Sequence, residues 1–188
     1  MPARCFSFSA LHAVFVLLLA SHAAQAGDFD VRTANLRETA AGWVLTARVD
    51  YALTRKAIEA LESGVELTFR VELAASRLRR WWFDPEVIEV TRDWRLAYDA
   101  LTKRYRVTYP DGRESTSHAT LFGALNAIGR VQELPVGPPD AIDARRRYDV
   151  AVRAVLDQQT LPGPLQLIAF WDDGFSLESD WYEWTMAP

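Results

Sequence analysis

The densest combination of cationic and aromatic side chains in the sequence is one short run in which Arg79, Arg80, Trp81 and Trp82 follow one another. An arginine guanidinium that stacks on an indole ring gains about 0.5–2 kcal/mol, and Trp and Arg are favoured anchors of protein interfaces. Neighbouring residues of a strand point to opposite faces, so Trp81 and Trp82 cannot both enter one core. The run therefore predicts a partner-binding site. A bulged strand end shielded by the two arginines is the alternative interpretation.

A second group of reactive side chains lies near the end of the chain, where Asp172, Asp173, Glu178 and Asp180 fall in an aromatic-rich tail. Two suitably spaced carboxylates are enough for glycoside hydrolysis. A carboxylate-dependent, glycosidase-like hydrolase is therefore one hypothesis. Solvated acids on a loop are the commoner explanation, and the spacing lacks the ligand pattern of a calcium loop.

The first 26 residues have the three parts of a cleavable export signal. Arg4 supplies the positive charge, an apolar run extends from Leu11 through Ala20, and small residues at Ala24 and Ala26 suit a signal peptidase. A membrane-spanning helix needs about 20 apolar residues, roughly twice the length of this run. We therefore expect cleavage after Ala26 and one periplasmic domain over residues 27–188.

Cleavage would remove Cys5 and two histidines, leaving 162 of the 188 residues, with no cysteine and only His118. Such a chain has no thiol nucleophile, thiolate metal site or covalently attached haem. A serine triad would have to use His118, which we interpret as an exposed residue near a helix start. No glycine loop for phosphate is present, and the acidic balance argues against nucleic acid. We therefore expect no catalytic residues, no metal site and no cofactor.

The elements that must position these groups are mainly strands. Strict alternation of apolar and polar residues, the pattern of half-buried strands, occurs in residues 43–51, 65–73, 93–99, 104–109 and 147–156. Residues 29–37 and 175–184 predict a first and a last strand. Phe69 belongs to an apolar face and Arg70 to the opposite one, so we expect Phe69→Asp to unfold the domain and Arg70→Asp to be tolerated.

Helices are expected to be few and short. Thr54 and Thr120 can cap two of them, ended by Gly64 and Gly129, and a third is expected near Pro164. Turns are predicted at residues 38–42, 99–102 and 110–112, and residues 134–144 are interpreted as a surface loop. Half-buried strands with short connections indicate antiparallel sheets with one wet face each. The predicted fold is a two-sheet sandwich with two or three peripheral helices.

Arginine recurs on the polar faces of the predicted strands. If those strands are neighbours, the molecule carries a local basic face. The alternative is a solvated surface on which acids such as Asp93 and Asp99 are interleaved. The arginines concerned are Arg95, Arg104, Arg106, Arg145, Arg147 and Arg153.

Taken in order, several modest motifs of the chain resemble a proteobacterial family of exported proteins, domain of unknown function 4390. These motifs are residues 61–67, the Arg-Arg-Trp-Trp run, residues 98–105, 119–121, 161–165 and 179–181. The family has no established activity, so the resemblance transfers no catalytic residue. It implies a gene neighbourhood with a nitrogen-regulation-type sensor kinase, and hence an accessory role in the periplasm.

Three hypotheses for function follow from the sequence. The first is a non-catalytic periplasmic binding or accessory module that contacts a membrane or envelope protein, such as the extracytoplasmic part of a sensor. The second is the carboxylate-dependent hydrolase. The third is a structural envelope protein whose surface serves only assembly. A closed cleft around Asp172, Asp173 or Glu178 would favour the enzyme, whereas an exposed aromatic patch would favour a partner.

Overall fold

The computed structural model describes residues 28–77, 86–143, 145–161, 163 and 173–186. Within this part of the chain, no helix is long and apolar enough to cross a membrane. The strands are β1 (Asp28–Thr39), β2 (Gly42–Ala52), β3 (Leu67–Arg77), β4 (Glu86–Asp99), β5 (Arg104–Thr108), β6 (Thr116–His118), β7 (Arg130–Gly137), β8 (Tyr148–Leu156) and β9 (Tyr182–Met186). The helices are α2 (Arg55–Glu62) and α3 (Leu121–Ile128), with short 3-10 turns η2 (Pro139–Ala141), η3 (Gln158–Thr160) and η4 (Asp173–Phe175).

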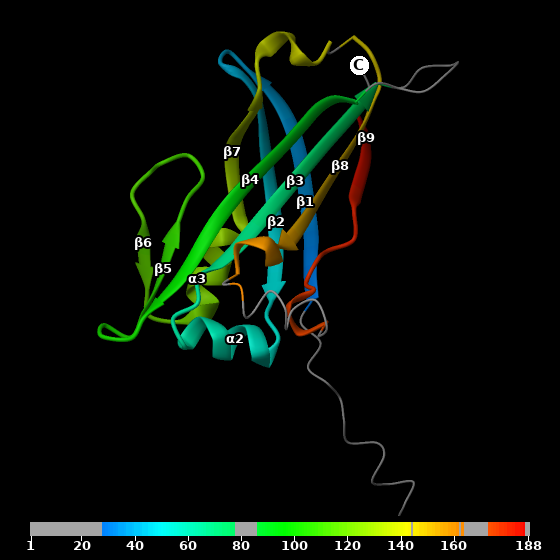
Figure 1. Cartoon of the computed structure of the whole chain (residues 1–188). Coiled ribbons are helices and arrows are strands. Elements are labelled where there is room, and N and C mark those ends of the chain that lie inside the picture. Colours follow the sequence, from blue (N-terminus) through cyan, green and yellow to red (C-terminus); the bar gives the residue numbers. More distant parts are fainter. Residues whose placement is uncertain (1–27, 78–85, 144, 162, 164–172, 187–188) are drawn as a thin grey trace, which may run out of the picture.

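Two antiparallel sheets pack face to face, which confirms the predicted sandwich (Figure 1). The three-stranded sheet has the order β1-β2-β7, and the six-stranded sheet has the order β6-β5-β4-β3-β8-β9. The viewer of Figure 1 looks onto the outer face of the six-stranded sheet, with the smaller sheet behind it. The outward side chains of the large sheet therefore meet solvent on this face.

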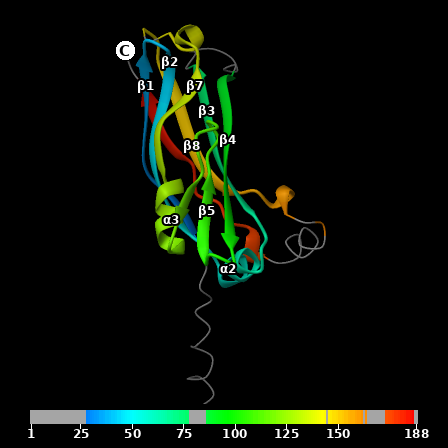
Figure 2. The ribbon, with the colours of Figure 1, turned by 90° about the vertical axis from the view of Figure 1, so that its left-hand side faces the viewer.

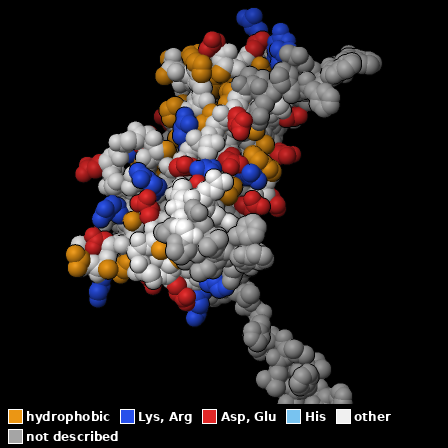
Figure 3. All heavy atoms as spheres, in the orientation of Figure 1, with side chains coloured by type: hydrophobic (Ala, Val, Ile, Leu, Met, Phe, Trp, Pro, Cys, Tyr) orange, Lys and Arg blue, Asp and Glu red, His pale blue; other side chains and the backbone are white. Residues whose placement is uncertain are grey.

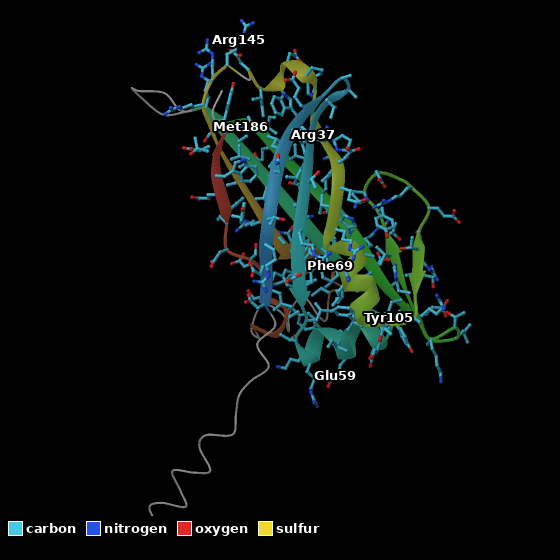
Figure 4. All side chains as sticks on the ribbon, turned by 180° about the vertical axis from the view of Figure 1, so that it is seen from behind. Arg37, Glu59, Phe69, Tyr105, Arg145 and Met186 are labelled. Atoms are coloured by element: carbon cyan, nitrogen blue, oxygen red, sulfur yellow. The ribbon has the colours of Figure 1, made fainter. Side chains whose placement is uncertain are left out.

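The core lies between the sheets and is built by the alternation of β2, β3 and β8. Phe69 is fully buried there (Figure 4). Its ring centroid lies 5.9 Å from that of Phe29 and 5.0 Å from that of Tyr51. The inward side chains of the three strands are Trp43, Leu45, Ala47, Val49, Tyr51, Leu67, Val71, Leu73, Ala75, Tyr148, Val150, Val152, Ala154 and Leu156. Their polar neighbours in the chain consequently face outward.

Both capped helices form where their capping residues predict them. The hydroxyl of Thr54 accepts a hydrogen bond from the backbone N–H of Ala57 at 3.2 Å, and that of Thr120 accepts one from Gly123 at 3.1 Å. Each bond satisfies a free N–H group of a first helical turn. Figure 4 places Glu59 of α2 and Tyr105 of β5 at one end of the sandwich. The third expected helix, near Pro164, lies outside the described residues.

The tight turn expected at residues 38–42 connects β1 to β2. Gly42 has a φ of 131°, a conformation that side chains with a Cβ rarely adopt. A Cβ at this position would also collide with the carbonyl oxygen of Gly137 in the adjacent strand β7. Glycine is therefore required where the hairpin approaches its neighbour.

Strand β7 corrects the interpretation of residues 134–144 as a loop, because pairing with β2 continues to Gly137. The register jumps from Leu45↔Leu134 to Ala47↔Val131, so β7 contains a bulge that interrupts the alternation of its sequence. Glu133 within it has a φ of 45°. β7 is an edge strand, where the missing N–H of a proline is tolerated.

The remaining differences concern strand length. The expected strand over residues 175–184 forms only as β9 from Tyr182, preceded by η4 and an extended segment held to β8 through Ser179, whose backbone N–H donates to Ala154. The short strand β6 was not expected. The central strand β3 begins at Leu67 rather than at Val65 and runs on to Arg77. Each difference concerns an edge strand or the end of a strand.

Candidate binding face around strand β9

The residues predicted to bind a partner, Arg79, Arg80, Trp81 and Trp82, lie outside the described residues. They follow Arg77, the last residue of β3, along the chain. Their role as a contact site remains a prediction. The side chains of Asp172 and Asp173 also lie outside the described part of the chain.

His118 is half-buried at the end of β6 rather than exposed. Its Nε2 lies 2.9 Å from the hydroxyl oxygen of Thr116. The prediction that this residue lies just before a helix is confirmed, since Thr120 caps α3. The hydrogen bond to Thr116 joins two residues of the same short strand.

Arg70 holds two carboxylates together on the outer face of the six-stranded sheet. Its guanidinium donates to Asp93 at 2.9 and 3.1 Å and to Asp157 at 2.7 Å. The hydrogen bond to Asp93, with the attraction of the nearby acids, raises the pKa of Arg70. Because only 6% of the Asp157 side chain is exposed, Arg70 neutralises a buried charge. Arg70 thus faces away from the core as expected, but its ion pairs now predict that Arg70→Asp, which would bring three carboxylates together, destabilises the domain.

Arg153 forms the next part of this face. Its guanidinium lies 2.7 Å from Glu72 and 3.5 Å from Glu178. It also covers the ring of Trp181, at 4.7 Å from the centroid. Arginine–indole stacking, which the sequence predicts for the Arg79–Trp82 run, occurs here between two residues that are distant in the sequence. Trp181 stays 40% exposed, so part of its ring is available to a partner.

Two further arginines of the predicted basic face, on β4 and β5, have acids beside them. Arg95 lies 3.7 Å from Glu66 and Arg106 lies 3.4 Å from Asp99. Acidic and basic side chains are mixed across the middle of this surface (Figure 3). For Arg95, Arg106 and Arg153 this agrees with the alternative interpretation, in which acids are interleaved among the arginines; Arg145 and Arg147 precede β8 rather than lie on a strand.

Small residues open a hollow of about 640 Å³ on the outer face of β3, β8 and β9. Ala74 and Ala151 lie opposite each other in the β3–β8 pairing, and their short side chains leave the sheet uncovered between larger neighbours. Glu183 pairs with Ala151 along the next strand. We call this the sheet hollow; its lining is Ala74, Ser76, Asp149, Val150, Ala151, Glu183, Trp184 and Thr185.

A second hollow of about 340 Å³ lies where the free edges of the two sheets approach each other. We call it the edge groove; its lining is Asp28, Phe29, Asp30, Val31, Glu178, Asp180, Trp181 and Tyr182. Four of these residues are acids and two are exposed or half-exposed aromatics. Within the described residues, no three Asp, Glu, His or Cys side chains are grouped so as to hold a metal ion.

The sheet hollow and the edge groove flank the strand β9, and we call the whole surface the β9 face. Some of its acids have partners: Asp30 lies 2.6 Å from Arg32, and Asp149 accepts a hydrogen bond from Thr185 at 2.9 Å. Asp28, Asp180 and Glu183 form no ion pair within the described part of the chain. The β9 face therefore combines acids that form no such ion pair with an exposed indole.

Within the β9 face, the sequence indicated the acids of the tail. It did not indicate that Arg153 lies beside Trp181. Arg153 lies on β8 and Trp181 just before β9. The dense aromatic residues of the tail were the available signal. Placing Arg153 beside them requires the register Val152↔Tyr182.

The chain matches a family model described as a domain of unknown function (DUF4390) over residues 26–185. No curated protein and no solved structure matches the chain.

Proposed function

The chain belongs to the DUF4390 family, and we propose that it is an exported accessory module that binds a partner protein through the β9 face. The predicted export signal supports a periplasmic site of action. The family resemblance supports a membrane-bound sensor as partner, contacted through its extracytoplasmic part. The proposal rests on one observation above all: the exposed ring of Trp181 lines the same groove as Asp28 and Asp180, which form no ion pair within the described residues.

The charge of the β9 face supports a partner segment with Lys or Arg side chains. Asp180 and Glu183 are both exposed, and each lines a hollow. Opposite charges across an interface increase the association rate and favour one partner over others. A cationic segment would find ready acceptors here, whereas an acidic one would be repelled.

Trp181 supports binding for a second reason. The Arg153 guanidinium lies over its ring and is itself held by Glu72 and Glu178. A tryptophan fixed before binding loses little side-chain entropy on association, and tryptophan is enriched among the residues that dominate interface energies. The hydrolase hypothesis would use Glu178 and Asp180, but Glu178 shares the guanidinium of Arg153, and the edge groove is open to solvent.

The test is a crosslinking pull-down from intact cells with charge-reversed variants. We expect Asp180→Arg and Glu183→Arg to recover much less of the partner than the unmodified chain does. Glu114→Arg is the matched control, since it makes the same charge change at an exposed position on the β5–β6 loop. All three variants should keep the melting temperature of the unmodified chain, because the replaced side chains are exposed.

Two results would contradict the proposal. One is recovery of the same proteins at the same yield by Asp180→Arg, Glu183→Arg and the control. The other is the capture of no protein by the unmodified chain.

A further inference from the structure

Among the residues that the structure describes, the most exposed large hydrophobic ones lie at one corner of the molecule, away from the β9 face. Leu101 is 97% exposed and Phe122 is 78% exposed. Leu101 belongs to the turn before β5, and Phe122 follows β6 by four residues. Tyr105 of β5 pairs with His118 of β6, and both hydrophobic residues lie beyond this same end of the β5–β6 pairing. Figure 3 shows hydrophobic side chains at this corner.

Helix α3 extends the apolar surface of this corner. It has no charged residue along its length; Leu121 and Leu125 are half-buried and pack against the core, whereas Phe122 is exposed. A surface helix of a soluble domain normally turns polar side chains to water, so the exposed ring of Phe122 is unusual. Figure 2 shows α3 beside β5 on this flank.

Cations flank this surface at both ends. Lys103 is exposed in the turn that carries Leu101, and Arg130 is exposed directly after α3. The acid of the same turn, Asp99, lies 3.4 Å from Arg106, which offsets its charge. Lys103 thus places a positive charge beside Leu101, although the whole chain has a formal charge of −4.

We propose that this α3 corner, formed by Leu101, Lys103 and Phe122, docks on an anionic lipid bilayer surface. Apolar side chains that protrude from a convex surface suit a fluid interface, which moulds around them. Exposed apolar side chains with basic residues nearby bind at the boundary between headgroups and acyl chains, and each Lys or Arg near an anionic surface adds to the attraction. Leu101 and Phe122 would enter that boundary while Lys103 and Arg130 contact phosphates.

The test is co-sedimentation of the exported chain with vesicles of phosphatidylglycerol and, separately, of phosphatidylcholine. We expect binding to the first, little binding to the second, and weaker binding as salt is added. The double variant Leu101→Ser/Phe122→Ser should lose at least about tenfold in affinity, which corresponds to about 1.4 kcal/mol. Its melting temperature should be unchanged, since both side chains are exposed.

Charge is tested with Lys103→Gln/Arg130→Gln, which should weaken binding to phosphatidylglycerol severalfold. The matched control is Arg145→Gln/Arg147→Gln, which removes two exposed cations elsewhere on the chain; Figure 4 shows Arg145 at the end of the molecule opposite Tyr105. Equal loss in both charge variants would overturn the assignment to the α3 corner. The absence of vesicle binding would also overturn it. So would a result in which the serine double variant still binds vesicles but dissociates a dimer in sedimentation velocity.

Discussion

Replacing Arg70 by alanine should destabilise the domain far more than replacing Arg95, although both arginines project from the same face of the large sheet. Arg70→Ala removes three hydrogen bonds to carboxylates, at 2.9, 3.1 and 2.7 Å. Asp157 would keep the backbone N–H of Gln159, at 2.9 Å, but no cation. Breaking a fully buried ion pair costs roughly 3–5 kcal/mol.

The Arg70 side chain is 26% exposed and that of Asp93 is 41% exposed, so screening reduces this cost to about 2–3 kcal/mol. For a domain of this size the melting temperature should fall by roughly 4–12 °C. Arg95→Ala, which breaks a 3.7 Å contact between side chains about half exposed, should cost less than about 0.5 kcal/mol. Thermal melts monitored by circular dichroism measure both variants.

A double-mutant cycle separates this ion pair from general packing. Asp157→Asn removes the buried charge, so Arg70→Ala should cost less in that background, by about 1–2 kcal/mol. Equal losses for Arg70→Ala and Arg95→Ala would refute the reasoning. Additive costs in the cycle would also refute it.

Four further outcomes are expected. Phe69→Asp should abolish the cooperative thermal transition, because an unpaired charge would enter the core; a folded variant would contradict the sandwich. Of Trp81→Ala and Trp82→Ala, one should lower the free energy of unfolding by about 3–5 kcal/mol, and the other should weaken partner recovery at unchanged melting temperature. Full recovery of the partner by the stable variant would show that the Arg79–Trp82 run serves packing and not binding. Hydrogen bonds from the backbone N–H groups of Thr102 and Leu101 lower the pKa of Asp99 in the folded protein. The ionised carboxylate therefore stabilises the fold above the unfolded pKa of about 3.9, and this stabilisation is lost as pH falls through the folded pKa. The stability difference between the unmodified chain and Asp99→Asn, followed by melts across pH, should therefore shrink in acid; a difference constant with pH would contradict this. Mass spectrometry of the periplasmic fraction should find a chain starting at Gly27, and a membrane-bound form that keeps Leu11 would exclude cleavage.

The central strands could be predicted because each has one buried and one solvated face. In β3, Phe69 and Arg70 alternate strictly, and the structure separates them as expected. Strand β7 could not be predicted in the same way, because the bulge at Glu133 shifts its side chains out of register. Strand β6 has only three residues, all polar, and carries no hydrophobic pattern.

The β9 face could be predicted only in part. The chemistry of an arginine stacked on tryptophan follows from residue types alone, and it occurs at Arg153 and Trp181. Those two residues meet because β8 and β9 are neighbours in one register, a non-local arrangement that alternation does not specify. In the same way, Arg70 looks like a solvated residue until the fold brings Asp157 to it.

The central claim, that the β9 face contacts a partner protein, is tested most directly by photo-crosslinking in living cells. Glu183 is replaced by the photo-crosslinking residue benzoylphenylalanine, and Glu114 is replaced in the same way as the control. We expect irradiation to yield a discrete adduct with one envelope protein from position 183 and none from position 114. An absence of adducts at position 183, or the same adducts at both positions, would contradict the assignment of the β9 face.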